Sequence, residues 1–211
     1  MPMNSEPGQA VYRLRKSTRK GELPKGYRAT LEVVEEATQT VQASCDLIGR
    51  AVFGTHDIRD GDGRLWRMAA NRKLAPSRWT VRDPDQRIVM QFDQKTFAKL
   101  SNPLWRVSLV LLDGADRELY RLVDPRSGVA DRIIGVGPGE WALMSGDRVV
   151  ANLGWLPNRE APPKGLLARL RRALTMNDQG IASVGAQHVL PAPVVLAMSM
   201  IHAELIDASA G

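Results

Sequence analysis

Few side chains in this sequence have the types and the spacing that catalysis needs. The histidines are His56, His188 and His202, and no two of them have the spacing of metal ligands. Cys45 is the sole cysteine, so this chain can form neither an intramolecular disulfide nor a cysteine-based zinc site. We expect Cys45 to be a small buried or solvated residue rather than a nucleophile, because no catalytic histidine or asparagine motif accompanies it.

An acidic cluster around Gly61 and Gly63, made of Asp57, Asp60 and Asp62, has some likeness to a calcium loop. An EF-hand needs oxygen ligands at alternating positions and a glutamate at the twelfth. Counted from Asp60, the fifth position is an arginine and the twelfth is an asparagine. Because Asp-Gly pairs supply the positive φ values of tight turns, we expect a hairpin turn here.

Two further patterns resemble catalytic or phosphate-binding motifs. Ser199 and His202 would share one helical face, where we expect them to satisfy buried polar groups rather than to catalyse a reaction. The glycine cluster at 135–139 is not followed by a helical pattern, so we expect a loop. Without a convergent set of catalytic groups, the sequence favours a protein that is not an enzyme and that needs no metal or cofactor.

The other chemistry that the sequence offers is the binding of anions. The chain has 29 Lys and Arg against 23 Asp and Glu, a net charge of +6. Residues 1–30 hold seven basic and two acidic residues, and residues 159–172 hold five and one. We expect residues 1–28 to be a flexible basic arm, which either contacts phosphates or only aids solubility. The candidate lipid- or anion-binding residues are Arg13, Arg15, Lys16, Arg19, Lys20, Arg169, Arg171 and Arg172.

Short strands separated by turns are expected from Val52 onward, because apolar and polar residues alternate there and Asp-Gly or Gly-Asp pairs favour hairpins. Residues 29–48 fit either a helix or a strand. The tryptophans at 79, 105 and 141 are unevenly spaced, which disfavours a propeller or solenoid. A meandering antiparallel sheet, closed on itself, is the better prediction. The clearest strand candidates are residues 64–68, 79–82, 88–90, 105–109, 118–122, 141–144 and 149–151.

Two C-terminal segments break the β pattern. Residues 164–175 place leucines on one face and basic residues largely off it, which predicts an amphipathic helix. Residues 189–206 are apolar nearly all round, but prolines interrupt one end and charged residues occupy the other, so we expect no membrane span. A helix that is apolar on all sides is expected to be surrounded by protein. We therefore predict a core helix over residues 193–207.

Hairpins followed by a buried terminal helix resemble the tubby C-terminal-like superfamily, in particular its phospholipid scramblase and LURP-one-related branch. The matching features are Leu65-Trp66, the segment 79–83, the Trp141 hairpin with residues 149–151, and the segment 193–207. The resemblance covers about residues 45–211. It implies a mainly β fold, in which about twelve antiparallel strands form a closed barrel around a central hydrophobic C-terminal helix. One such domain would span residues 29–211, without catalytic machinery.

The resemblance also implies lipid chemistry, because tubby proteins bind phosphoinositide head groups and scramblases are linked to calcium-dependent lipid redistribution. This chain lacks the acidic segment before the final helix and the cysteine cluster of scramblases, so we do not expect calcium-dependent scrambling. We expect a cytoplasmic barrel that binds anionic phospholipid or phosphoinositide head groups at the inner face of the membrane. The alternatives are a protein-interaction adaptor without a lipid role and, ranked lower, nucleic-acid binding through the basic arm.

Overall fold

Strands make up most of the chain that the computed structural model describes, which comprises residues 11–17, 29–47, 53–73, 76–94, 106–124, 141–155, 181–184 and 189–209. The strands are β1 (Val11–Ser17), β2 (Ala29–Glu35), β3 (Val41–Leu47), β4 (Thr55–Asp60), β5 (Leu65–Ala70), β6 (Arg78–Arg82), β7 (Ile88–Asp93), β8 (Arg106–Leu112), β9 (Glu118–Asp124), β10 (Trp141–Ser145), β11 (Arg148–Trp155) and β12 (Ile181–Val184). One helix, α3 (Ala192–Ser209), follows β12. Each of the clearest strand candidates overlaps one of these strands, although Arg64 precedes β5 and Trp105 lies outside the described residues.

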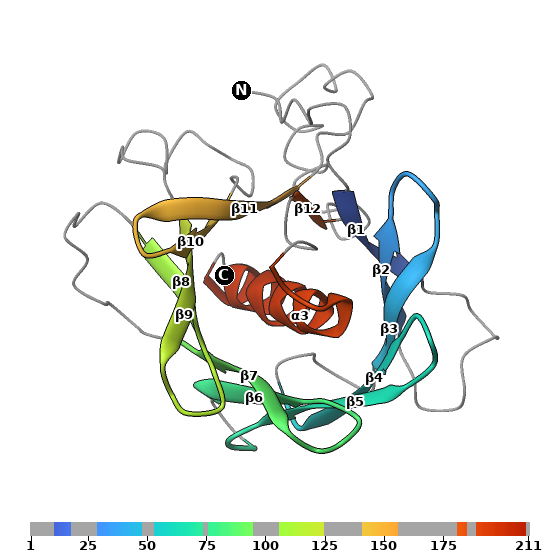
Figure 1. Cartoon of the computed structure of the whole chain (residues 1–211), viewed down its shortest axis with the longest axis horizontal. Coiled ribbons are helices and arrows are strands. Elements are labelled where there is room, and N and C mark those ends of the chain that lie inside the picture. Colours follow the sequence, from blue (N-terminus) through green and yellow to red (C-terminus); the bar gives the residue numbers. More distant parts are fainter. Residues whose placement is uncertain are drawn as a thin grey trace.

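The strands form an antiparallel meander in which each strand pairs with its neighbours in the chain (Figure 1). The first strand, β1, pairs with β2 and also with the last strand, β12, in the register Val11↔Val184 to Arg13↔Ala182. The strand order is therefore that of a ring, β1-β12-β11 and so on down to β2. The predicted mainly β architecture, an antiparallel sheet with a C-terminal helix, is confirmed.

Helix α3 lies inside this ring of strands (Figure 1). Its first turn begins where the Val194 and Val195 amides donate to the Pro191 carbonyl oxygen, at 2.9 and 3.0 Å. Pro193 is compatible with this turn, because the first amides of a helix have no partner within the helix. Side chains from Val194 to His202 are buried on every side of the helix. A helix is thus present where the sequence predicts one, with one more residue at its start and two at its end, and its described side chains from Val194 onward are buried.

The sizes of the side chains on the inner face of the ring account for the position of α3. The helix packs mainly against β2, β3 and β4. On β3 the inward residues include the small Ala43 and Cys45, which let the helix approach closely. On other strands the inward positions carry bulky residues such as Trp79 and Phe92, which fill the wider space between helix and wall.

Three of the tight hairpins share one sequence pattern, an aspartate followed four residues later by an arginine. The turns are Asp60–Arg64, Asp83–Arg87 and Asp113–Arg117, and in each the aspartate amide donates to the arginine carbonyl. The fourth residue of each turn has a positive φ (79° at Gly63, 64° at Gln86 and 61° at Asp116), as in three-residue hairpin loops. In the first turn the Asp60 carboxylate accepts the amides of Asp62 and Arg64. The hairpin predicted there is confirmed.

Other predictions need correction or lie outside the described chain. Residues 11–17 form β1, so the prediction of a flexible arm is wrong for them, and the sheet does not begin at residue 29. The segment 29–48, which fits either a helix or a strand from its sequence, contains two strands, β2 and β3. The amphipathic helix predicted at 164–175 and the glycine cluster at 135–139 lie outside the described residues.

Candidate functional site

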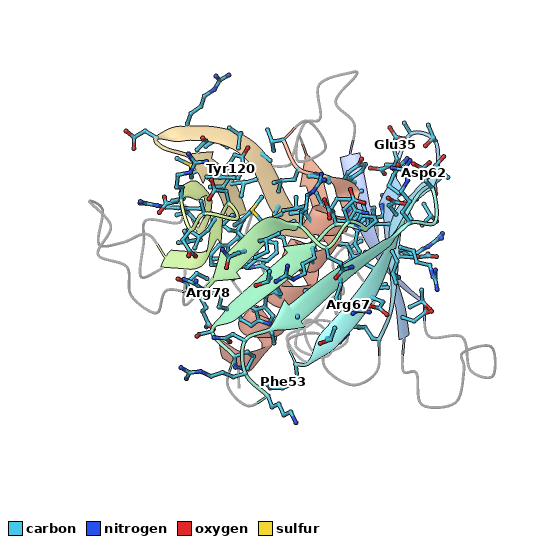
Figure 2. The ribbon with its side chains drawn as sticks, turned by 60° about the horizontal axis from the view of Figure 1, so that its bottom comes forward. Glu35, Phe53, Asp62, Arg67, Arg78 and Tyr120 are labelled. Carbon is cyan, nitrogen blue, oxygen red and sulfur yellow. The ribbon has the colours of Figure 1, made fainter. Side chains whose placement is uncertain are left out.

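The meander divides the connections between strands into two groups, because successive connections alternate between the two ends of an antiparallel sheet. The short turns after β2, β4, β6, β8 and β10 lie at one end, which we call the hairpin rim. The longer connections after β1, β3, β5, β7, β9 and β11 join strand ends at the other end, the opposite rim. Figure 2 shows Glu35 and Asp62 close together at one end and Phe53 at the other.

The hairpin rim is acidic. Its turns (residues 35–41, 60–64, 83–87, 113–117 and 145–148) contain nine Asp and Glu against four Arg. Three of the arginines pair with an aspartate of their own turn, as in Arg117 Nε–Asp113 Oδ2 at 2.7 Å. The amide of Arg117, above other causes, lowers the pKa of the Asp113 carboxyl. The carboxylates of this rim therefore stabilise the turns. The rim as a whole keeps an excess of negative charge.

The connections that join strands at the opposite rim contain more basic than acidic residues. Residues 18–28, 48–54, 71–77, 94–105, 125–140 and 156–180 together contain 16 Lys and Arg against five Asp and Glu. Arg72 and Lys73, in the part of these connections that the structure describes, are exposed and have no carboxylate partner among the described residues. The positive charge of the chain is thus concentrated in the connections of one rim.

The anion-binding residues predicted from the sequence have different surroundings. Arg13 and Arg15 point outward from β1 and pair with carboxylates, Arg13 with Glu36 and Arg15 Nη2 with Glu32 Oε2 at 2.7 Å. These partners neutralise much of the charge that a ligand would meet. Lys16 is on β1, but its side chain lies outside the described part of the chain. The remaining predicted residues, Arg19, Lys20, Arg169, Arg171 and Arg172, also lie outside it.

A polar pocket that sequence reasoning missed opens between β3 and β4 on the outer wall. Its volume is about 380 Å³. The lining residues are Ser44 and Asp46 on β3, Thr55, His56, Asp57 and Arg59 on β4, and Arg67 on β5. We call this site the β3–β4 pocket.

The pocket exists because β3 and β4 separate. The two strands pair at Ala43↔Asp60, Ser44↔Arg59 and Cys45↔Ile58, and the pairing ends there. Continued by one residue, it would place Asp46 directly opposite Asp57. Like charges directly opposite each other destabilise a strand pair. Two opposed carboxylates would therefore oppose any further pairing, and no motif in the sequence reveals this because it depends on the register.

Some of the charged side chains that line the pocket form an ion pair with each other, and others do not. Arg67 Nε donates to Asp57 Oδ1 at 3.0 Å, so these two residues neutralise each other. Asp46 accepts a hydrogen bond from the Thr30 hydroxyl at 2.7 Å but has no cationic partner among the described side chains. Arg59 likewise has no carboxylate partner in the described part of the molecule. Among the described residues, the β3–β4 pocket thus presents one cation and one anion that lack an ionic partner.

Two buried residues behind the pocket, His56 and Cys45, have the surroundings of residues that stabilise the fold. His56 is 5% exposed, and its Nε2 lies 2.8 Å from the Phe53 carbonyl oxygen. Cys45 is 2% exposed, and burial, with the nearby Asp46 and Asp57, raises the pKa of its thiol to about 12. Because the thiolate is the reactive form, Cys45 is unsuited to nucleophilic attack at neutral pH. The prediction of a small buried cysteine is confirmed.

Ser199 and His202 are both buried, each 2% exposed. The His202 ring meets the Trp141 ring edge to face, with ring centres 4.6 Å apart at 75°. The contact joins α3 to β10 and extends the apolar packing around the helix.

Two further features are absent from the part of the chain that the structure describes. No cluster of three or more His, Cys, Asp or Glu there could hold a metal ion. Among the same residues, no helix has both the length and the apolar character needed to cross a bilayer.

Comparison with known proteins adds little at the level of sequence. No protein-family model matches the chain, and no curated protein matches it significantly. An X-ray structure of a protein from Arabidopsis thaliana aligns with 95% of this chain and 91% of its own chain, at 11% identity and a TM-score of 0.46. A likeness at this level identifies neither a family nor a function.

Proposed function

We propose that this protein is a non-enzymatic, closed tubby- or scramblase-like barrel that attaches peripherally to anionic membranes through the connections of its opposite rim. The observation that carries the proposal is the charge difference between the rims. Positive charge near an anionic lipid surface contributes about 1 kcal/mol per residue, whereas acidic turns are repelled by it. Attachment through the basic connections would therefore turn the hairpin rim away from the membrane.

The filled interior supports binding at the surface rather than inside. In the described part of the molecule α3 and the inward side chains occupy the space within the ring, which leaves the outer wall and the rims for a ligand. The basic connection 156–180 also carries Leu166, Leu167 and Leu170 beside its arginines. Basic residues interleaved with leucines are typical of segments that bind at a membrane interface. This composition favours a membrane over a nucleic acid.

Co-sedimentation with vesicles tests the proposal. We expect the full chain to bind phosphatidylcholine vesicles that contain phosphatidylglycerol at least about tenfold more strongly than pure phosphatidylcholine vesicles, and salt should weaken this binding. Equal binding to the two kinds of vesicle at low salt would contradict the proposal. Strong, salt-sensitive binding to RNA or DNA without vesicle binding would favour the nucleic-acid alternative instead.

A matched pair of variants locates the surface. The triple variant Arg169→Gln, Arg171→Gln, Arg172→Gln removes three charges from a connection of the opposite rim. The double variant Arg64→Gln, Arg87→Gln removes charge from the hairpin rim. The triple variant should lose most of the vesicle binding, and the double variant should bind as the wild type does. The reverse result would place attachment at the hairpin rim and overturn the proposed orientation.

A further inference from the structure

We propose that the β3–β4 pocket binds a small zwitterion, in which a phosphate is joined by a short linker to a primary ammonium group. This ligand site does not depend on attachment through the opposite rim. It rests on Arg59 and Asp46, which have no ionic partner in the described part of the chain and which line one cavity from two strands.

The anionic half of the ligand would lie against Arg59. A guanidinium offers five N–H donors in a planar fork, which suits a phosphate. Ser44 is the cross-strand partner of Arg59, and its hydroxyl lines the same pocket. Arg67 uses its Nε for Asp57 and retains its terminal N–H groups. The wall around Arg59 therefore has more hydrogen-bond donors than its own residues use.

The cationic half would lie against Asp46. Asp46 and Asp57 both line the pocket, just beyond the last paired residues of the two strands. Asp57 is already neutralised by Arg67, whereas Asp46 has only the Thr30 hydroxyl among the described side chains. A primary ammonium supplies the three donors and the positive charge that this position lacks. A simple anion would meet two carboxylates, so the pocket favours a ligand that carries both charges.

The volume agrees with a ligand of this kind. At about 380 Å³ the pocket lies within the range of small-molecule sites, about 300–1,000 Å³. The lining residues are all polar or charged in type, and none of them except His56 carries an aromatic ring. A small, hydrated, charged molecule fits such a lining better than an apolar one.

Titration of the full chain with O-phosphoethanolamine, followed by NMR of the backbone amides, tests the proposal. Shifts should concentrate at residues 44–46 and 55–59. Ethyl phosphate lacks the ammonium and ethanolamine lacks the phosphate, so each should bind at least about tenfold more weakly. If phosphoethanolamine shifts no amides at the pocket, or binds no better than ethyl phosphate, the proposal fails.

Three variants test which residue binds the anionic half of the ligand and which binds the cationic half. Arg59→Gln should weaken binding of phosphoethanolamine at least about tenfold and leave ethanolamine binding unchanged. Asp46→Asn should weaken it as much and leave ethyl phosphate binding unchanged. Arg148→Gln is the matched control, because Arg148 is exposed on another strand and lacks an ion pair among the described residues. An effect of Arg148→Gln as large as that of Arg59→Gln would show that only net charge matters and would refute the site.

Vesicles distinguish a lipid head group from a free molecule as the source of the zwitterion. If phosphatidylethanolamine in phosphatidylcholine vesicles recruits the wild type but not Arg59→Gln, the ligand is a head group; if only the soluble compound binds, it is a free metabolite. Either result retains the pocket chemistry. Binding to phosphatidylglycerol vesicles, which lack the amine, should be the same for Arg59→Gln and the wild type. Failure of the pocket proposal is thereby separated from failure of membrane attachment.

Discussion

The inner and outer faces of β3 and β4 have opposite chemistry, although their residues alternate along the same two strands. Inward, Ala43, Cys45 and Ile58 are at most 2% exposed and pack beneath α3. Outward, Ser44 and Asp46 face Asp57 and Arg59 around the polar pocket. The inner face stabilises the fold and the outer face is available to bind a ligand. Changes on one face should therefore leave the property of the other largely intact.

The largest effect is expected from a charge placed inside. Leu196 is fully buried in α3, and Leu196→Asp would leave an unpaired carboxylate in the core. We expect a loss of about 5 kcal/mol or more, comparable to the whole stability of many domains. The measurement is the free energy of unfolding in urea, or the yield of folded protein if the variant does not fold.

The matched control for this variant is Leu65→Asp. Leu65 is 39% exposed at the start of β5, so its substitution should change the free energy of unfolding by only about 1 kcal/mol or less. Similar losses at Leu65 and Leu196 would mean that the described interior is not the core of the protein.

An intermediate effect on stability is expected from a substitution at the point where β3 and β4 separate. Asp46→Thr removes the repulsion with Asp57 and introduces a residue that favours strands. The pairing should extend past Cys45↔Ile58, stabilise the protein by about 0.5–1 kcal/mol and slow amide exchange near residues 46 and 57. Asp46→Glu, which keeps the charge, is the control. Unchanged exchange in Asp46→Thr would exclude repulsion as the cause of the separation.

The smallest effect is expected at an outer turn, where a carboxylate holds a hairpin. Hydrogen bonding by the Arg117 amide lowers the pKa of Asp113 in the folded protein, so the carboxyl stabilises the fold when it is ionised. That stability is present above the pKa of the unfolded chain and is lost as the pH falls through the folded pKa. Asp113→Asn should lower stability at neutral pH and flatten its decline at acid pH. An unchanged acid limb in urea unfolding at several pH values would contradict this role.

Much of the inner face could be predicted from the sequence, because apolar periodicity reports burial. Trp79 and Val81 alternate with polar residues and indicated a strand. The run from Val194 to Ile201, apolar except for Ser199, indicated an enclosed helix. Strand β1 was missed, because its outward Arg13 and Arg15 resemble a solvated tail when their partners Glu36 and Glu32 are unknown.

The candidate pocket could not be predicted in this way. It depends on the register of β3 against β4, in which Asp46 and Asp57 would be opposite each other if the pairing continued past Cys45↔Ile58. Nothing local to either strand encodes that pairing. The recurring aspartate-to-arginine spacing of the turns was readable in the sequence, but only the backbone bonds show that it marks three equivalent hairpins.

Enclosure of α3 is the central claim, because a filled interior leaves binding to the outer wall and the rims. Hydrogen–deuterium exchange of the full chain tests it most directly. Amides of residues 196–201 in α3 should exchange as slowly as those of β6 and β7, since they can open only when the ring unfolds. Exchange in α3 that is orders of magnitude faster than in those strands would contradict the account, because the helix would then open without the ring.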